Sequence, residues 1–158
     1  MDDRKEVFFR LVSTILKPLG FKRKGTRWTK RTEDSDVTIH LQESSARYSF
    51  YLNAEYRFHE APKHRYPDLS FRIDEAPFLN LETDTDFDEV QRRLPGYLTQ
   101  EIVPKILSLA SLQSKAWNYP PIGAGGGKSE YLRAKKPDKF GGDPCPEFSI
   151  WHYLKDEK

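Results

Sequence analysis

The chain has 158 residues, of which 26 are basic and 24 are acidic, so its formal net charge is +2 at pH 7. This length suits one domain, and the near balance of charges excludes the strongly basic composition of a general polyanion-binding protein. Aromatic residues make up 13% of the chain, which supplies apolar surface for a core and excludes a fully disordered chain.

The sequence also limits where the protein is expected to work. Cys145 is the single cysteine, which excludes an internal disulfide and a cysteine-based metal cluster. No stretch approaches the roughly 20 apolar residues of a membrane span, and the charged start MDDRKEVFF differs from a signal peptide. We therefore expect a reduced cytoplasmic protein that does not associate with membranes.

Residues 3–17 have the apolar spacing of an amphipathic helix. Its buried face is predicted to contain Val7, Phe8, Leu11, Val12, Ile15 and Leu16. Asp2 or Asp3 can cap the start of this helix. Pro18 and Gly20 predict its end, because proline cannot continue a helix and glycine commonly follows one.

The apolar spacing then changes to the two-residue alternation of strands. The stretch FKRKGTRWTKR, residues 21–31, is predicted to be a strand, or a hairpin bent at Gly25. Three further segments, 37–42, 48–58 and 69–74, alternate strictly between apolar and polar residues. The first two are joined around residues 44–46 by a connection of hairpin length, whereas residues 59–67 contain two prolines and are expected to form a loop.

Helical spacing returns after residue 83. The stretch TDTDFDEVQRRL contains an Asp-x-x-Glu pattern, Asp86 to Glu89, that is typical of a helix start. We expect Pro95 and Gly96 to end this helix, and Pro104 to kink the next one or to begin a new first turn. The buried side of that next helix is predicted to contain Leu98, Ile102, Val103, Ile106, Leu107 and Leu109.

From residue 118 onward the chain is rich in proline and glycine. We expect a long surface segment with one short helix at residues 129–134. The apolar stretch FSIWHYL that follows is expected to form a last strand or to return to the domain. The predicted organisation is a single domain over residues 1–117 and a C-terminal extension over residues 118–158 that packs back on it.

These elements predict an α+β fold with one antiparallel sheet. The predicted order is a helix, a meander of about four or five strands, and further helices. Because strictly alternating strands bury one face only, the helices are expected to pack on that face.

The stretch GAGGGKS, residues 123–129, resembles a nucleotide-phosphate loop. Such a loop has the pattern G-x-x-x-x-G-K-[ST] between a strand and a helix. Here its first glycine would have to stand where the chain has Ile122, and the preceding WNYPP does not suit a buried strand. We interpret the stretch as a flexible linker that binds no nucleotide.

The polar side of the predicted sheet is the main candidate for a binding site, because alternation places its side chains on one surface. The candidate residues are His40, Gln42, Tyr51, Asn53, Glu55, Arg57 and Arg72. Mixed polar side chains that pair across strands also occur on an ordinary exposed sheet face. Three interpretations remain open: an ordinary exposed face with only a structural role, a face that binds a protein or small molecule, and acid–base catalysis by His40 and Glu55.

The sequence indicates neither a metal site nor an activated nucleophile. The stretch FHEAPKH places His59 and His64 in a proline-containing loop rather than at the spacing of a zinc-binding helix. Cys145 lies between two prolines without a nearby base, and no G-x-S-x-G motif occurs. We therefore predict no metal and no cofactor, and we assign no enzymatic activity.

A nucleic-acid contact is a further hypothesis. Residues 17–31 contain seven basic residues and no acid, whereas residues 74–89 contain seven acids and no base. The candidate contacts are Lys22, Arg23, Lys24, Arg27 and Trp28. Phe21 and Trp28 could stack on bases, or they could point into the core while the basic side chains protect a sheet edge. The low net charge favours the second alternative.

Three motifs follow one another along the chain, LKPLGFKRKGTRWTKR, TIHLQES and FYLNAEY. In this order they resemble the bacterial domain of unknown function 4304 family, over about residues 5–115. The matching positions are Gly20 and Phe21 before basic residues, Gln42 and Ser44 around a strand end, and Asn53 within a strand. The chain departs from the pattern at Glu43, where the pattern has lysine, and at Ala54 and Glu55, which follow the asparagine.

The resemblance implies an α+β fold and a bacterial origin, and the family has no established activity. Small single-domain proteins of this kind are often immunity or accessory proteins beside toxins. We therefore expect a non-enzymatic protein-binding module whose separated charges help to select a partner. The alternative is a small-molecule or nucleic-acid site on the polar face, which requires a concave surface there.

Overall fold

The computed structural model describes residues 3–45, 47–61, 63, 67–73, 79–110 and 127–128, the last two by their backbone alone. In chain order the elements are α1 (Asp3–Leu16), the 3-10 turn η1 (Lys17–Leu19), β1 (Lys22–Lys24), β2 (Arg27–Arg31), β3 (Ser35–Glu43), β4 (Phe50–Phe58), β5 (Leu69–Ile73), α2 (Asp84–Gly96), the π-helical η2 (Tyr97–Ile102), α3 (Val103–Leu107) and β6 (Gly127–Lys128).

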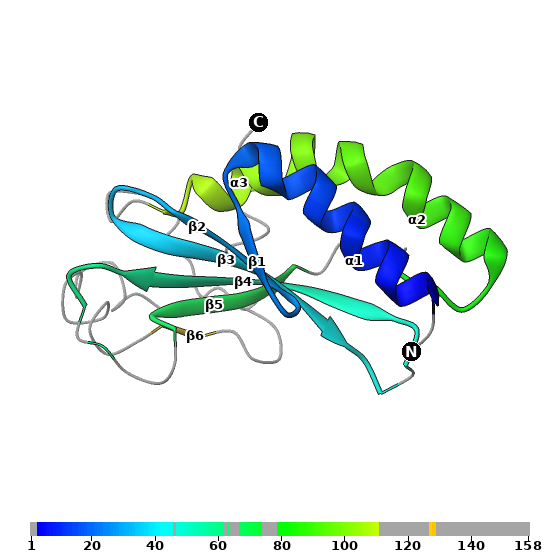
Figure 1. The fold of residues 1–158 in the computed structure, drawn as a ribbon. Coiled ribbons are helices and arrows are strands. Elements are labelled where there is room, and N and C mark those ends of the chain that lie inside the picture. The colour runs from blue at the N-terminus through cyan, green and yellow to red at the C-terminus, as the bar shows by residue number, and fades with distance from the viewer. Residues whose placement is uncertain are drawn as a thin grey trace.

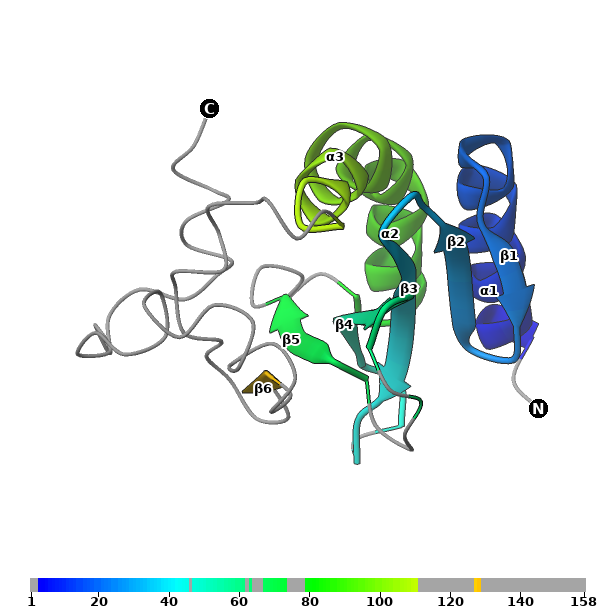
Figure 2. The same cartoon turned by 90° about the vertical axis from the view of Figure 1, so that its left-hand side faces the viewer.

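The strands form one antiparallel sheet in the order β1-β2-β3-β4-β5-β6, so each strand pairs with its neighbour in the sequence. Buried residues alternate with less buried ones along β3, β4 and β5. The helices α1, α2 and α3 lie on the same side of the sheet, as Figures 1 and 2 show. The predicted α+β meander with helices on one face is therefore confirmed.

The chain turns from α1 into the sheet at Gly20. This residue has a φ of 95°, in the left-handed region that favours glycine, and its N–H donates to the carbonyl of Lys17 at 3.0 Å. Gly25, with a φ of 63°, bends the hairpin between β1 and β2. The predicted end of the first helix and the hairpin alternative for residues 21–31 are thus confirmed.

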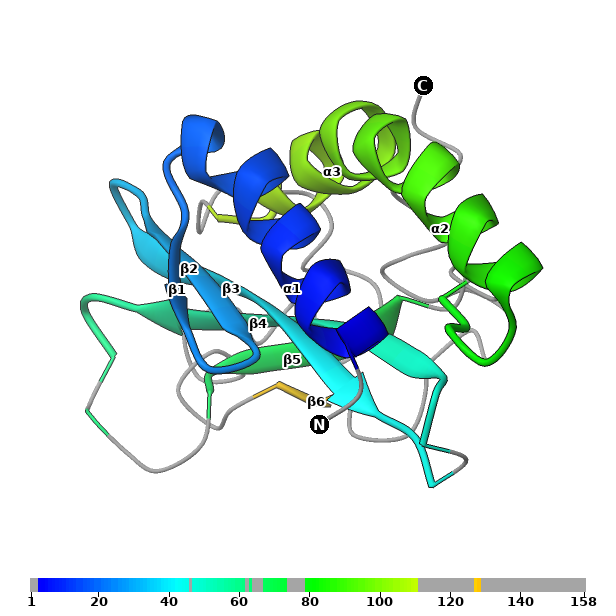
Figure 3. The same cartoon turned by 45° about the vertical axis from the view of Figure 1, so that its right-hand side comes forward.

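An aromatic cluster anchors α1 to the sheet. The ring centroids of Phe8 and Phe9 lie 5.1 and 5.6 Å from that of Phe50 on β4. Trp28 on β2 is 1% exposed, and its indole N–H donates to Ser13 Oγ on α1 at 3.0 Å. Figure 3 shows α1 lying across the strands that carry these rings. Buried aromatic side chains therefore replace much of the aliphatic core that the composition lacks.

The predicted buried face of α1 is wrong in one respect. Val7 was expected in the core but is 40% exposed, whereas Phe9 is buried. The helix turns Phe9 toward the sheet because Phe50 and Trp28 lie there and offer large apolar surfaces. The other predicted positions are buried or partly buried against the core: Phe8, Leu11, Val12, Ile15 and Leu16.

The predicted start of α2 is also wrong. The helix is capped at Thr83 rather than at Asp86, because the Thr83 side chain accepts from the backbone N–H of Asp86 at 3.0 Å. α2 ends at Gly96, as predicted, but the chain does not leave the helical conformation there and continues through η2 into α3. Pro104 stands in the first turn of α3, as one of the two alternatives predicted.

Burial explains why the run tolerates Pro95. Leu94, Leu98, Ile102 and Ile106 recur every four residues and are all buried. The wider turn of a π-helix keeps this spacing on one face. Burying each such side chain stabilises the fold by about 1.5–3 kcal/mol, so two of them offset the roughly 3 kcal/mol that an internal proline costs.

Several predicted features lie at or beyond the limits of the described residues. β4 begins at Phe50, two residues later than predicted, after an isolated bridge between Ser49 and Asn80. The predicted helix at 129–134 and the stretch FSIWHYL lie outside the described residues. The backbone of Gly127 and Lys128 forms β6 beside β5. No helix in the described part of the chain is both long and apolar enough to cross a membrane.

Two buried hydroxyl groups tie the sheet to α3 and to the residues that follow it. Tyr56 on β4 donates to the carbonyl of Ile106 at 2.6 Å, and Ser35 on β3 donates to the carbonyl of Ala110 at 2.9 Å. The Ile106 carbonyl also accepts from the backbone N–H of Leu109 at 3.2 Å, so the first bond mainly satisfies the buried Tyr56 hydroxyl. A buried hydroxyl without a partner would cost free energy. Burial also raises the pKa of Tyr56 well above its ordinary value, because it disfavours the phenolate.

The variant Tyr56→Phe should lower the free energy of unfolding by about 0.5–1.5 kcal/mol, because it removes one buried hydrogen bond between the sheet and α3. Tyr51→Phe is the matched control, since the Tyr51 side chain is 41% exposed. Its loss of the hydroxyl should change stability by less than about 0.5 kcal/mol. Urea denaturation measures both variants, and equal midpoints would show that the Tyr56 hydroxyl does not hold the helix to the sheet.

Candidate functional site

A row of side chains crosses four strands on the polar face of the sheet. The strand register pairs Arg27 with His40, His40 with Asn53, and Asn53 with Arg72. These residues come from β2, β3, β4 and β5 in turn, on the side of the sheet opposite the helices. Directly paired positions have Cβ atoms about 4.5–5.5 Å apart, so their side chains can act together.

Glu55 lies beside this row and faces two of its members. Arg27 Nη2 lies 3.3 Å from Glu55 Oε1, and His40 Nδ1 lies 3.8 Å from the same oxygen. The second distance is too long for a hydrogen bond, so Arg27 is the main partner of the carboxylate. Next to this pair, Asn53 Nδ2 donates to Gln42 Oε1 at 2.9 Å.

A cavity of about 330 Å³ opens among these side chains. The described residues that line it are Arg27, His40, Gln42, Asn53, Glu55, Ser70 and Phe71. We call it the His40 cavity. Its volume lies at the lower end of the range for small-molecule sites, about 300–1,000 Å³. The Arg27 guanidinium faces the Glu55 carboxylate, so the two charges balance. The other polar groups of the lining are two amides, a hydroxyl and an imidazole.

The surroundings of His40 favour the neutral form of its imidazole. Partial burial lowers the pKa of His40 below its ordinary value of 6.5, because desolvation disfavours the charged ring. The Arg27 guanidinium lowers this pKa further, whereas the Glu55 carboxylate raises it. At pH 7 the ring therefore has one nitrogen that donates and one that accepts hydrogen bonds.

A contact between an arginine and a tyrosine ring lies beside the His40 cavity. The guanidinium carbon of Arg72 lies 3.9 Å from the centroid of the Tyr51 ring, a cation–π contact. Arg72 Nε is buried and has no hydrogen-bond partner among the residues that the structure describes. Because Tyr51 pairs with Gln42 and Arg72 pairs with Asn53 across the strands, this contact borders the cavity directly.

The structure brings most of the predicted binding residues together. His40, Gln42, Asn53 and Glu55 line the His40 cavity, and Tyr51 and Arg72 border it. Arg57 is separate, because it lines a different cavity two residues further along β4.

Three residues of the cavity were not predicted to belong to it. Arg27 was predicted as a nucleic-acid contact, yet it completes the cavity through its pairing with Glu55. Ser70 shares the alternation of Arg72, so the pattern could have found it. Phe71 belongs to the buried side of β5, and no sequence signal marks it as lining the cavity.

The predicted basic contacts do not form one surface. Trp28 is 1% exposed and does not reach a ligand at the surface, so the alternative in which it points into the core is confirmed. The Arg23 guanidinium lies over the rings of Phe9 and Trp28, 5.5 and 5.6 Å from their centroids. Lys22 and Lys24 are exposed on β1, the strand at one edge of the sheet, where their charges oppose pairing with another strand.

Other predicted chemistries can be compared with the described residues. Within them, no group of three or more histidine, cysteine, aspartate or glutamate side chains could hold a metal ion. His64 and Cys145 lie outside them. Gly127 and Lys128 of GAGGGKS have their backbone in an antiparallel strand, whereas a phosphate-binding loop leads into a helix at that point.

Comparisons with known proteins give no relationship, since no family model, no curated protein and no solved structure matches the chain. The resemblance to the domain of unknown function 4304 family therefore stays a prediction. The function has to be inferred from the geometry of the side chains.

The electrostatics of the His40 cavity predict two shifts of opposite sign. Arg27→Gln should raise the pKa of His40, because it removes a positive charge that lowers it. Glu55→Gln should lower this pKa, because it removes the negative charge that raises it. An NMR titration of the His40 ring protons measures both.

Arg57→Gln is the matched control, because it removes a guanidinium on the same face that does not act on His40. It should leave the pKa of His40 unchanged. Shifts of the same sign in the Arg27 and Glu55 variants would contradict the described arrangement of charges.

Proposed function

We propose that the protein is a non-enzymatic binding protein that holds a small, uncharged polar ligand in the His40 cavity. The observation that carries this proposal is the cavity itself, because a flat and fully solvated sheet face would offer a small ligand no enclosure. The balanced charges of Arg27 and Glu55 favour a neutral ligand over an ion.

The lining suits a ligand that both donates and accepts hydrogen bonds. The neutral His40 ring offers one donor and one acceptor. The amides of Asn53 and Gln42 are held by their mutual hydrogen bond and retain further donors and lone pairs. Planar amides and heterocycles present donors and acceptors side by side, so these ligand classes fit best.

Binding accounts for the geometry better than acid–base catalysis does. A carboxylate that orients a catalytic histidine hydrogen-bonds to its ring, whereas Glu55 Oε1 lies 3.8 Å from His40 Nδ1. The same carboxylate oxygen is engaged by Arg27 at 3.3 Å. Glu55 therefore serves to hold Arg27 in the wall of the cavity.

An NMR screen of neutral amides, purines, pyrimidines and sugars against the ¹⁵N-labelled protein tests this proposal. We expect saturable shifts centred on the amides of His40, Asn53 and Ser70. His40→Phe should raise the Kd roughly tenfold or more, because the ring loses its hydrogen-bonding nitrogens and each such bond contributes about 1 kcal/mol.

Tyr51→Phe is the control for that experiment, since it changes a side chain that borders the cavity without lining it. It should bind the ligand as the wild type does. No saturable ligand in the screen, or equal affinities for the wild type and His40→Phe, would refute the proposal.

A second candidate function is binding of another protein, which the Tyr51–Arg72 contact favours. Tyrosine and arginine are enriched among residues that dominate the energy of protein interfaces, and here one is exposed and the other is stacked on it. With this second function we also propose that the protein is an immunity or accessory protein in a reduced cytoplasm.

Affinity capture from a lysate of the organism that makes the protein tests this candidate. A partner captured by the wild type should be lost with Tyr51→Ala/Arg72→Ala. It should be retained with Lys22→Ala/Lys24→Ala, whose substitutions lie on the β1 edge. The same recovered proteins from both double variants would argue against an interface at Tyr51 and Arg72.

A further inference from the structure

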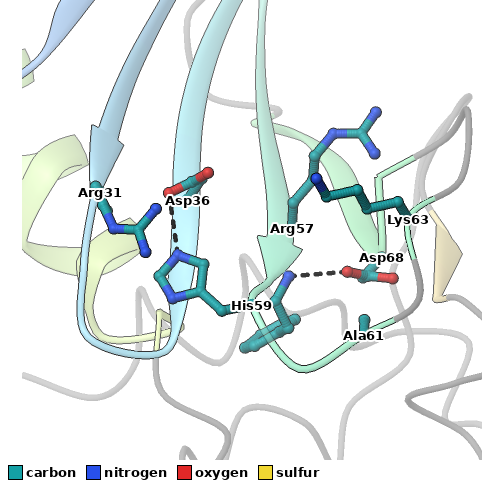
Figure 4. A pocket seen from close by; sticks show the side chains of 8 residues that line it. Arg31, Asp36, Arg57, His59, Ala61, Lys63 and Asp68 are labelled. Carbon is teal, nitrogen blue, oxygen red and sulfur yellow. Dashed lines mark hydrogen bonds and ion pairs between the residues drawn. The ribbon is translucent and has the colours of Figure 1, made fainter.

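A second and larger cavity, of about 520 Å³, lies on the polar face where β2 and β4 end and β3 begins (Figure 4). The register aligns Arg31, Asp36 and Arg57 across these three strands. His59 and Lys63, which follow β4, and Asp68, which precedes β5, complete its polar lining. We call it the Arg31 cavity.

Both acidic side chains of the Arg31 cavity are occupied by groups of the protein. Asp36 Oδ1 lies 3.1 Å from Nε2 of His59, whose Nδ1 in turn donates to the carbonyl of Glu33 at 3.1 Å. Asp68 is 3% exposed, and its Oδ2 accepts from the backbone N–H of Phe58 at 2.8 Å. These carboxylates hold the walls of the cavity together, as the dashed lines of Figure 4 indicate.

The basic side chains are arranged differently. Arg31 and Lys63 are exposed, and neither forms an ion pair or a side-chain hydrogen bond with the described residues. Figure 4 shows the Arg31 guanidinium directed toward His59 and the Lys63 chain extending toward Arg57. Two arginines and one lysine therefore line the cavity against two carboxylates, and Arg31 and Lys63 have donors available for a ligand.

We propose that the Arg31 cavity binds a phosphate group, held by Arg31 and Lys63 with Arg57 nearby. Guanidinium and ammonium groups form short, charge-assisted hydrogen bonds with phosphate oxygens, and a planar guanidinium can donate two in parallel. The excess of basic groups distinguishes this cavity from the His40 cavity, where the charges balance. Because 520 Å³ exceeds the volume of one phosphate, the ligand class that fits is a small phosphate ester.

The probes are inorganic phosphate and glycerol 3-phosphate, added to the ¹⁵N-labelled full chain at constant ionic strength. We expect saturable shifts in the backbone amides that line the Arg31 cavity, above all at residues 57–59 and 68. Tighter binding of glycerol 3-phosphate would show that the cavity also accepts the organic part, whereas equal binding would identify the phosphate group alone as the ligand. No saturable shift at millimolar concentrations of either probe would overturn the proposal.

The variant Arg31→Gln/Lys63→Gln should weaken binding at least tenfold, because two charged donors are lost. Lys22→Gln/Lys24→Gln is the matched control. It also removes two positive charges, from exposed positions on the β1 edge of the sheet. All four side chains are exposed, so both variants should fold, and their melting temperatures verify this. Equal losses in the two variants would show nonspecific attraction to a basic surface and would refute a specific site.

Discussion

The register of β3 against β4 is the constraint on which both the core and the polar face depend. These strands pair from Ser35 with Phe58 to Glu43 with Phe50, and their alternate residues are buried under the helices. A slip of one residue would bring Thr38 and His40 into the core and expose Ile39. The apolar half of each strand therefore determines where the polar half can lie.

The aromatic cluster positions β2 beside β3, toward the edge of the sheet. Trp28 reaches Phe9 and Ser13 on α1, so the helix holds β2 in place beside β3. Arg23 covers the outer side of these rings. The basic segment 17–31 thus serves more than one purpose. Phe21 and Trp28 belong to the core, and Lys22 and Lys24 oppose pairing of the edge strand β1 with another strand.

The two cavities show how one sheet face can carry sites of different chemistry. The His40 cavity pairs Arg27 with Glu55 and is otherwise neutral, whereas the Arg31 cavity has its carboxylates engaged by His59 and by the Phe58 amide. Glu55 and Arg57 stand two residues apart on β4, so the two sites lie next to each other along one strand. A ligand with a polar ring and a phosphate group would combine both chemistries.

The sequence by itself determined the element types, the alternating strands and the shared face of His40, Gln42, Asn53 and Glu55, because the periods of helices and strands are local properties. It did not determine that Arg27 would pair with Glu55, or that Arg57 would line a different cavity from His40. Nor did it determine that the helical run would continue past Pro95. Those outcomes depend on contacts between residues far apart in the chain. Strand neighbours set the distances between charged groups, and burial of Leu98 and Ile102 outweighs the local cost of a proline.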